Sequence, residues 1–535
     1  MKKLAICFLF ILVTACGRSI EPPLEAYPEP YPETIETPAQ VPYVYQPEEP
    51  EEIPQTQTIT LDLDYAIAIA NERRAIPHVQ DLDRINEMVY GRTPSIIDWD
   101  RLFHPIPRPQ ALSREEAIDD VKIFFQVLQH AYGPYRRFGG DEVFRPLMYS
   151  IIEELSESET VATGLLAWMI QGEIAPIIAD NHFVFNDRPQ NVSSFDFVWD
   201  SPFGRDETGF RQLDTGLYVT EIVGHDKHDV FRLSVNEHGE FFYMLVIFRP
   251  SEDGTLYRLE VVFCNGETEV LVLRRSFHHF QPDYDAEPTL RFENEIPIVT
   301  MRGEMPFPVD TVWTDYSGSI PDNAVLFLSF VDEIRDEPII IVDIRTNIGG
   351  FGHLGTLWLY DLIGEIVPLR LCVVHGAGAI PPEDMSQLPQ VWYDFFNPQE
   401  EAVQFFADLD EFLPSWHVLD DYHSVFSSES GSVANDTFII LLVDRFVYSA
   451  AEMFTSQILN MENTLVIGQN TFGSNIASMW PSLYLPNSGI QFNMGTNYVM
   501  RPYGTWQDGV GYAPDVWVVG DALTAALAIV QLTKD

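Results

Sequence analysis

Residues 437–475 read TFIILLVDRFVYSAAEMFTSQILNMENTLVIGQNTFGSN, and this stretch decides the fold. The aliphatic run Phe438–Val443 predicts a buried strand. After a short turn, residues 449–458 carry apolar side chains at helical spacing, and 465–467 predicts a second short strand. The pattern therefore predicts a strand–helix–strand unit, with Ser449 where the first strand leads into the helix.

Ser449 has the position that a serine nucleophile needs. At a helix N-terminus its hydroxyl can be exposed, and the next backbone N–H groups point outward with the positive end of the helix dipole. The same N–H groups can hold a developing oxyanion. The alternative is purely structural: Ser449 is an N-cap, and Glu452 closes a capping box.

Three further stretches place polar residues and glycines beside predicted strands. Residues 339–350 read IIIVDIRTNIGG, a buried strand followed by a polar turn with two glycines. Paired glycines let a backbone N–H approach a reacting carbonyl without a side chain in the way. The other two stretches are GQNTFGS at 468–474 and DGVGYAPDV at 508–516.

In their order and spacing, the four stretches resemble the C-terminal processing (tail-specific) serine peptidase family, whose other branch is the tricorn protease core. The corresponding patterns are D-x-R-x-N-x-G-G, S-A-x-E, G-x-x-T-F-G and E-G-x-G-I-x-P-D. The resemblance implies an α/β fold with a ClpP/crotonase-like peptidase core. It also implies hydrolysis of peptide bonds through a serine nucleophile.

The chain departs from the processing branch at the catalytic base. That branch has a lysine directly after T-F-G, where this sequence has Ser474. A histidine is therefore expected, and the resemblance to the tricorn branch points to His182, within IAPIIADNHFVF at 174–185. His353, which closely follows the two glycines, is the alternative base. None of the lysines lies near a motif: Lys2, Lys3, Lys122, Lys227 and Lys534.

The resemblance also assigns groups that support the histidine. In the tricorn branch the histidine is steadied through a hydroxyl and a distant glutamate. Here Asn181 stands at the hydroxyl position and Asp508 at the glutamate position, and both keep hydrogen-bonding capacity. Ser474 can donate a further hydrogen bond. We expect activity to fall below about pH 6 as His182 becomes protonated.

The glycine turn and the start of the helix after Ser449 are expected to bind the oxyanion, and an ion pair is expected to hold the turn. We expect the oxyanion to be held by the N–H of Ala450 and by the N–H of Gly349 or Gly350. Arg345 is expected in an internal ion pair with Asp343 or another carboxylate. That pair would fix the glycine turn.

The N-terminal residues predict export. A short basic start precedes an apolar segment, and LVTAC at 12–16 resembles a bacterial lipobox. We therefore expect residues 1–16 to be a lipoprotein signal peptide, with lipid attached to Cys16 and the protein anchored to the outer face of a bacterial membrane. An ordinary signal peptide is the alternative. Residues 17–58 are rich in proline and glutamate, which predicts an unfolded linker.

The remaining chain divides into three predicted parts. These are an N-terminal helical domain at 59–186, a β-rich segment at 187–320 that is a possible degenerate PDZ domain, and the serine peptidase core at 321–535. In the helical domain, Ser113 and Glu116 predict a capping box. In the core, strands are expected at 325–330, 339–344 and 370–374, with a helix after Gly350 and crossover connections.

Composition excludes some classes of function. A net charge of −49 excludes nucleic acid as a partner, because phosphate binding needs a basic surface. The cysteines show no metal-ligand spacing, so neither a metal nor another cofactor is expected.

The favoured interpretation is a lipid-anchored extracytoplasmic serine peptidase acting on peptides or proteins. The alternative from another class is a catalytically inactive surface lipoprotein that binds peptides or a protein partner, which the missing lysine favours. An acyl-CoA enzyme of the crotonase fold is disfavoured, because that substrate is not expected outside the cell.

Overall fold

The structure is a computed structural model and describes residues 61–74, 97–190, 194–250, 255–276, 286–303, 322–350, 352–365, 367, 372–375, 417–420, 423–426, 432–477, 482–500 and 508–534. The predicted signal peptide, Cys16 and the linker lie outside these residues. The described residues belong to one compact unit. Within the described ranges, no helix combines the length and the apolar character needed to cross a membrane.

A six-stranded sheet forms the centre of the peptidase core, and its first two strands lie at 289–300, within the predicted β-rich segment. Its first two strands pair antiparallel, and all later neighbours pair in parallel. The strands expected at 339–344, 438–443 and 465–467 are therefore confirmed, with helices in the crossovers. In spatial order the strands are β12 (Thr289–Glu293), β13 (Ile296–Thr300), β14 (Ile339–Asp343), β18 (Phe438–Val443), β19 (Thr464–Gly468) and β23 (Val516–Trp517).

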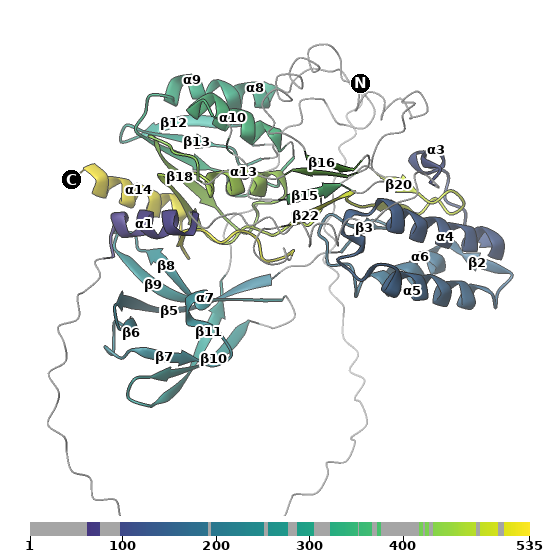
Figure 1. The fold of residues 1–535 in the computed structure, drawn as a ribbon, viewed down its shortest axis with the longest axis horizontal. Helices are drawn as coiled ribbons and strands as arrows, with labels where there is room; N and C mark the ends of the chain where they lie inside the picture. The colour runs from purple at the N-terminus through teal and green to yellow at the C-terminus, as the bar shows by residue number, and fades with distance from the viewer. Residues whose placement is uncertain are drawn as a thin grey trace, which may run out of the picture. The chain divides into compact units, whose positions relative to one another are not determined.

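Both faces of the sheet are covered at its central strands, which explains why β18 is apolar at every position. Successive side chains point to opposite faces. Leu441 and Val466 are fully buried on one face, and Ile440 and Leu465 on the other. The first face packs against α10 (His353–Ile363) and α13 (Ala450–Ile458), and α8 (Asp322–Ser329) and α9 (Val331–Ile334) lie beside these two helices (Figure 1). The second face packs against α14 (Ala522–Lys534) and α1 (Leu63–Arg74).

The strand expected at 325–330 is wrong, because this segment lies in α8 and the turn after it. The run VLFLSF is apolar throughout, and such a short run does not distinguish a strand from a buried helix. In the structure Phe327 is fully buried, whereas Val325 and Leu326 are 51% and 38% exposed. This one-sided burial is typical of a helix on the surface of a sheet.

The N-terminal helical domain is built on three helices, α4 (Arg114–Ala131), α5 (Gly140–Leu155) and α6 (Thr163–Ile174). The capping box is confirmed, because Ser113 and Glu116 bond each other's backbone at the start of α4. The shorter elements are α3 (Trp99–Phe103), η1 (Gly133–Tyr135), β1 (Ala111–Ser113) and β2 (Thr160–Ala162).

A C-terminal hairpin completes the hydrophobic core of the helical domain. Phe492 lies on this hairpin and packs edge-on against Phe124 of α4, with ring centroids 5.3 Å apart. The hairpin also pairs with the strand that directly follows His182. The helical domain and the peptidase core therefore share structure at the point where the predicted base lies. The strands of this sheet are β20 (Leu483–Tyr484), β21 (Gln491–Asn493), β3 (Val184–Phe185) and β4 (Arg188–Pro189).

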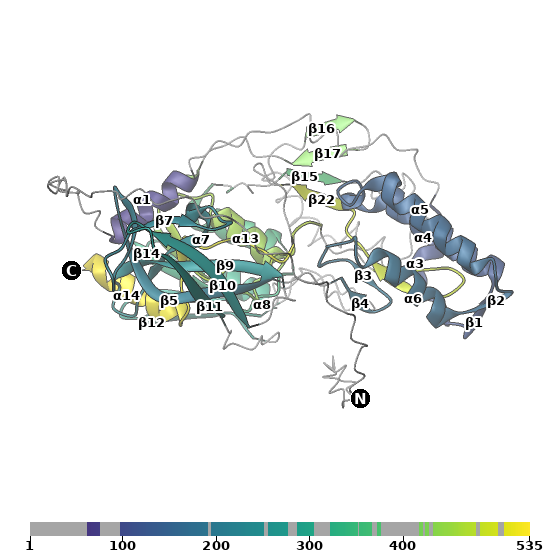
Figure 2. The same cartoon turned by 90° about the horizontal axis from the view of Figure 1, so that it is seen from below.

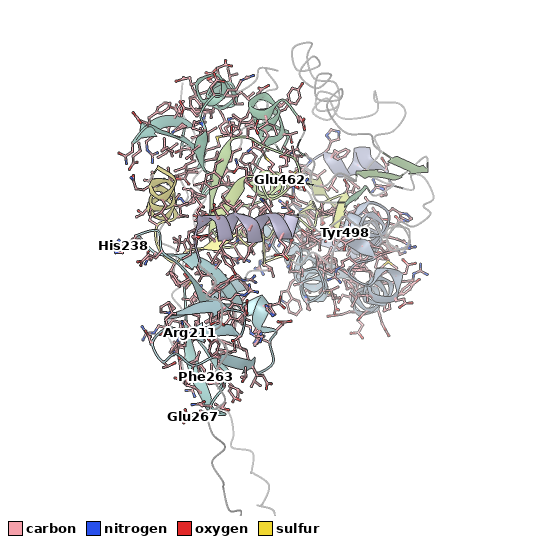
Figure 3. All side chains as sticks on the ribbon, turned by 60° about the vertical axis from the view of Figure 1, so that its left-hand side comes forward. Arg211, His238, Phe263, Glu267, Glu462 and Tyr498 are labelled. Atoms are coloured by element: carbon pink, nitrogen blue, oxygen red, sulfur yellow. The ribbon has the colours of Figure 1, made fainter. Side chains whose placement is uncertain are left out.

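The β-rich segment forms a seven-stranded antiparallel sheet. Figure 3 labels Arg211 on β6, and Phe263 and Glu267 at the turn between β10 and β11. The strands are β5 (Ser194–Asp206), β6 (Gly209–Gln212), β7 (Val219–Ile222), β8 (Phe231–Val235), β9 (Phe241–Pro250), β10 (Leu256–Phe263) and β11 (Thr268–Arg275), with the short α7 (Lys227–Val230) before β8.

A further four-stranded antiparallel sheet contains the strand expected at 370–374, here β15 (Cys372–His375) (Figure 2). Its edge strand lies beside the loop that follows T-F-G, because the Val499 N–H donates to the Ile476 carbonyl over 2.9 Å. The other strands are β16 (His417–Asp420), β17 (His423–Phe426) and β22 (Asn497–Met500).

Candidate active site

Ser449 lies between β18 and α13, at the junction that the sequence predicts. Its φ of 52° is rare for a residue with a side chain, and such strain is frequent at functional positions. The Ser449 hydroxyl makes no capping bond to the helix backbone. The purely structural alternative, an N-cap with a capping box, is therefore wrong.

Glu452 has a different partner from the one that a capping box requires. Its fully buried carboxylate accepts the N–H of Gly473 over 2.9 Å and that of Ser474 over 2.7 Å. It also accepts the Thr471 hydroxyl over 2.5 Å. Glu452 thus holds the T-F-G loop against the first turn of the nucleophile helix.

His182 lies on the turn between α6 and β3, and its Nε2 is 3.0 Å from Oγ of Ser449. Asp180 holds this turn, because its carboxylate accepts the His182 N–H over 2.8 Å. The Tyr132 hydroxyl donates to the same carboxylate over 2.8 Å. The side chains of His182 and Asp180 are almost wholly buried. The structure therefore brings His182 to Ser449, in hydrogen-bonding distance.

The other ring nitrogen of His182 faces the T-F-G loop. Nδ1 lies 3.3 Å from Oγ of Ser474. Ser474 occupies the position at which the processing branch carries its lysine. The ring of Tyr448 packs edge-on against the imidazole, with centroids 5.4 Å apart and an interplanar angle of 78°.

Asp508 joins two loops through their backbone amides. One of its carboxylate oxygens accepts the Asn181 N–H over 2.7 Å. The other accepts the N–H of Asn475 over 3.2 Å and of Ile476 over 3.1 Å. Asn181 itself donates its side-chain amide to the Gly473 carbonyl over 2.7 Å. Asp508 and Asn181 therefore fix the turn that carries His182 against the loop that carries Ser474.

The glycine turn packs directly on Ser449. A Cβ on Gly349 would lie 2.6 Å from the Tyr448 carbonyl and 2.8 Å from the Ala450 nitrogen, so only glycine fits there. The Gly349 N–H already donates to Oδ1 of Asn347 over 2.9 Å. Of the two glycines, Gly350 is therefore the better oxyanion donor beside Ala450. Gly350 has a φ of 122°, which glycine adopts readily.

Arg345 forms the internal ion pair that the sequence predicts. Its guanidinium makes two parallel bonds of 2.8 Å to Asp343, and a third bond to Asp521 at the start of α14. Arg302 also binds Asp343. Burial alone would raise the pKa of Asp343, but Arg345 and Arg302 outweigh it and hold that pKa below its ordinary value. A charged network thus anchors the strand end before the glycine turn.

The alternative base, His353, is the first residue of α10. Its side chain lies outside the described part of the structure. Tyr448 and Asp180 are the site residues that sequence reasoning missed. Tyr448 directly precedes the nucleophile and Asp180 stands two residues before His182, so their nearness to the motifs is the one signal that could have identified them.

Burial lowers the pKa of His182 to about 4, although a bond with the Ala477 backbone raises it slightly. Because its pKa is lowered, the imidazole stays neutral at lower pH than an ordinary histidine does, and it can still accept a proton there. The lowered pKa of His182 therefore moves the expected loss of activity to a lower pH than the sequence alone predicts. The rate of Ser449 acylation should stay level from pH 7 to about 5 and fall as the pH drops through about 4.

A second buried group titrates in the same range and serves as the control. Burial raises the pKa of Asp180 to about 6. If the measured rate instead falls near pH 6, and this fall disappears in Asp180→Asn, Asp180 limits the pH profile and the prediction for His182 is wrong.

The part of the chain that the structure describes holds no group of three or more His, Cys, Asp or Glu side chains placed to bind a metal ion. The geometry assembled at Ser449 offers a hydroxyl and an imidazole whose Nε2 lies 3.0 Å from it. These are the components of acyl transfer.

Comparison with known families agrees with this chemistry. The model of peptidase family S41 matches residues 322–518, which include Ser449, both turn glycines and Asp508. This segment of the chain is an S41 peptidase domain. It is therefore a serine-type peptidase, and peptides or proteins are its substrates. Among curated proteins, none matches the S41 chain in sequence.

Several solved structures are similar to the S41 chain. Mature CPAF complexed with lactacystin has 13% identity and a TM-score of 0.38, over 79% of this chain and 98% of that chain. The photosystem II D1 C-terminal processing protease has 12% identity and a TM-score of 0.34, over 79% and 97%. The tricorn protease has 13% identity and a TM-score of 0.28, over 79% and 37%. These TM-scores are below 0.5, so the family assignment rests on the match at 322–518.

Proposed function

We propose that the S41 chain hydrolyses peptide bonds with Ser449 as nucleophile and His182 as general base. The distance of 3.0 Å between His182 Nε2 and Ser449 Oγ carries this proposal. It lies within the range that proton transfer in a catalytic pair requires, about 2.6–3.2 Å.

In the proposed reaction, Oγ of Ser449 attacks the carbonyl carbon of the scissile bond, and its proton passes to Nε2 of His182. The carbonyl oxygen becomes negatively charged and accepts the N–H groups of Ala450 and Gly350. His182 then gives the proton to the leaving amine as the C–N bond breaks. Water repeats the sequence on the acyl-enzyme, releases the new carboxylate and restores Ser449.

Asp508 contributes to this reaction through geometry. It binds the backbone beside His182 and beside Ser474, so it maintains the spacing between the base and the Ser474 loop. Glu452 in turn holds that loop against the nucleophile helix. A displacement of about 1 Å can cost roughly a hundredfold in rate. We also propose that the core is ClpP/crotonase-like, which is supported by its parallel β14–β18–β19 order with helical crossovers.

A fluorophosphonate probe tests the proposed function on the full-length protein. The wild-type chain should form a covalent adduct on Ser449, located by mass spectrometry of the peptide that contains it. Ser234→Ala is the control, because Ser234 is buried in the β-rich sheet on β8. An unlabelled wild-type protein would instead support the inactive surface lipoprotein that binds peptides or a protein partner.

The export signal leads to a separate proposal, that Cys16 is lipidated and anchors the peptidase to the outer face of a bacterial membrane. LVTAC at 12–16 after an apolar segment supports it. In cells that process lipoproteins, Cys16→Ala should remove the lipid and move the protein from the membrane fraction to the soluble fraction, or leave the precursor uncleaved. A wild-type mature chain with an unmodified N-terminus elsewhere would contradict this proposal.

A further inference from the structure

Arg445 lies in the turn between β18 and Ser449, and it is buried, with 6% of its surface exposed. Its guanidinium donates to backbone carbonyls of two different loops. Nη1 donates to the Thr471 carbonyl over 2.8 Å, and Nη2 donates to the Gly509 carbonyl over 3.1 Å. Arg445 thus joins the turn that carries the nucleophile to the T-F-G loop and to the loop at 508–512.

The T-F-G loop and the 508–512 loop pack backbone against backbone. A Cβ on Gly473 would lie 2.5 Å from the Gly511 nitrogen, so no side chain separates the two loops. Their carbonyls meet at Arg445, which also donates to the Val510 carbonyl over 3.4 Å. A guanidinium presents five N–H donors in a fixed planar fork, whereas a lysine ammonium is a single point charge. Arginine therefore suits a position at which one side chain must bind carbonyls of two loops.

The turn that carries Arg445 is itself held by hydrogen bonds. The Asp444 carboxylate accepts the Phe446 N–H within the turn over 2.9 Å. The same carboxylate oxygen accepts the Thr346 N–H, from the glycine turn, over 3.0 Å. These bonds fix the conformation of the turn, so a shift of Arg445 would also shift Ser449.

The loop that carries Asp508 connects Arg445 to His182. Gly509, whose carbonyl accepts from Arg445, directly follows Asp508 in the sequence. The Asp508 carboxylate accepts the Asn181 N–H over 2.7 Å, and His182 is the next residue. Two side chains therefore join the turn of the nucleophile to the turn of the base.

We propose that Arg445 is a positioning residue that sets the distance between Ser449 and His182, acting through the loop at 508–512. The nucleophile and the base come from segments that are far apart in the sequence, and their 3.0 Å contact depends on how those segments are joined. The inference rests on the proposed function and adds to it a residue that does not touch the reacting atoms.

Two exchanges at Arg445 test the proposal on the full-length protein. Arg445→Met removes the bonds to both loops. It should lower kcat for peptide hydrolysis about a hundredfold, the effect of about 1 Å of displacement, with little change in KM. Arg445→Lys keeps the charge but binds the two loops less completely. It should recover part of this loss and remain about tenfold below the wild type, the effect of one lost hydrogen bond.

The double variant Arg445→Met/Asp508→Asn tests whether the two side chains act in series. Asp508→Asn replaces one accepting oxygen by an amide that cannot accept, and so breaks the other end of the same connection. If either exchange alone breaks the connection, the double variant should be no slower than the slower single variant. Independent contributions would instead multiply.

Hydrogen exchange of the backbone at 179–185 reports on the turn of the base without any substrate. Exchange there should be faster in Arg445→Lys than in the wild type. Arg114→Met is the matched control, because Arg114 also donates to a backbone carbonyl, that of Ser156, over 3.2 Å. It should change neither kcat nor exchange at 179–185. If thermal melting shows that Arg445→Met does not fold, Arg445→Lys takes its place in the single and double variants.

Three results would each overturn the inference: wild-type kcat in Arg445→Lys, unchanged exchange at 179–185 in that variant, or multiplied losses in the double variant. If the wild-type protein cleaves no peptide but exchange at 179–185 responds to Arg445→Lys as expected, the proposed function fails. The connection from the turn of Arg445 to the turn of His182 then still stands.

Discussion

Ser449→Ala and His182→Ala are each expected to lower kcat for peptide hydrolysis by roughly 10⁴–10⁶-fold, and the double variant should be little worse. Without the hydroxyl there is no nucleophile. Without the imidazole, the hydroxyl, with its high intrinsic pKa, keeps its proton. The two side chains act as one unit across a 3.0 Å contact, so losing the second adds almost nothing. Fluorescent peptide or casein hydrolysis under matched conditions measures the three rates.

The control for the histidine exchange is His238→Ala. His238 lies on the turn between β8 and β9 (Figure 3), where its side chain is 73% exposed. This variant should retain the wild-type rate. Full activity in His182→Ala would assign the base to another group, and multiplicative losses in the double variant would show that Ser449 and His182 act independently.

Arg345→Ala is expected to lower the free energy of unfolding by about 3 kcal/mol, and activity with it. Removing one partner of a buried ion pair typically costs 3–5 kcal/mol. Arg302 still binds Asp343 in the variant, so the stranded charge stays partly compensated and the low end of this range applies. Denaturant midpoints with unchanged slopes measure the loss.

An exposed ion pair provides the matched comparison. Arg335 pairs with Asp332 over 3.6 Å, and their side chains are 52% and 84% exposed. Exposed pairs contribute about 0–1 kcal/mol, so Arg335→Ala should change stability by less than 1 kcal/mol. Equal effects of the two exchanges would refute the structural role of Arg345.

Local sequence was enough to predict the elements that carry the nucleophile. Phe438–Val443 is aliphatic at every position because helices cover both faces of its sheet, and the turn before Ser449 marks its end. The run at 325–330 has similar apolar content, yet it is a helix. Its burial depends on α10 and the sheet, which local periodicity does not encode.

Some residues of the site could be predicted from the sequence and others could not. Ser449, His182 and Arg345 could be identified because motif chemistry depends on their side chains. The function of Asp508 could not be predicted, because its partners are backbone N–H groups, which every residue except proline carries. Tyr448 was missed because its hydroxyl reaches the Asn181 carbonyl, 267 residues away along the chain.

The hydrogen bonds by which Asp508 joins two distant loops have a consequence for biosynthesis. Its contact with Asn181 spans 327 residues of sequence, so it forms only after almost all of the described chain has been made. A nascent chain that already contains His182 and Ser474 still lacks the carboxylate that fixes their loops. We expect such a chain to remain latent until synthesis has passed Asp508, so that the enzyme cannot cleave other proteins during its own translation.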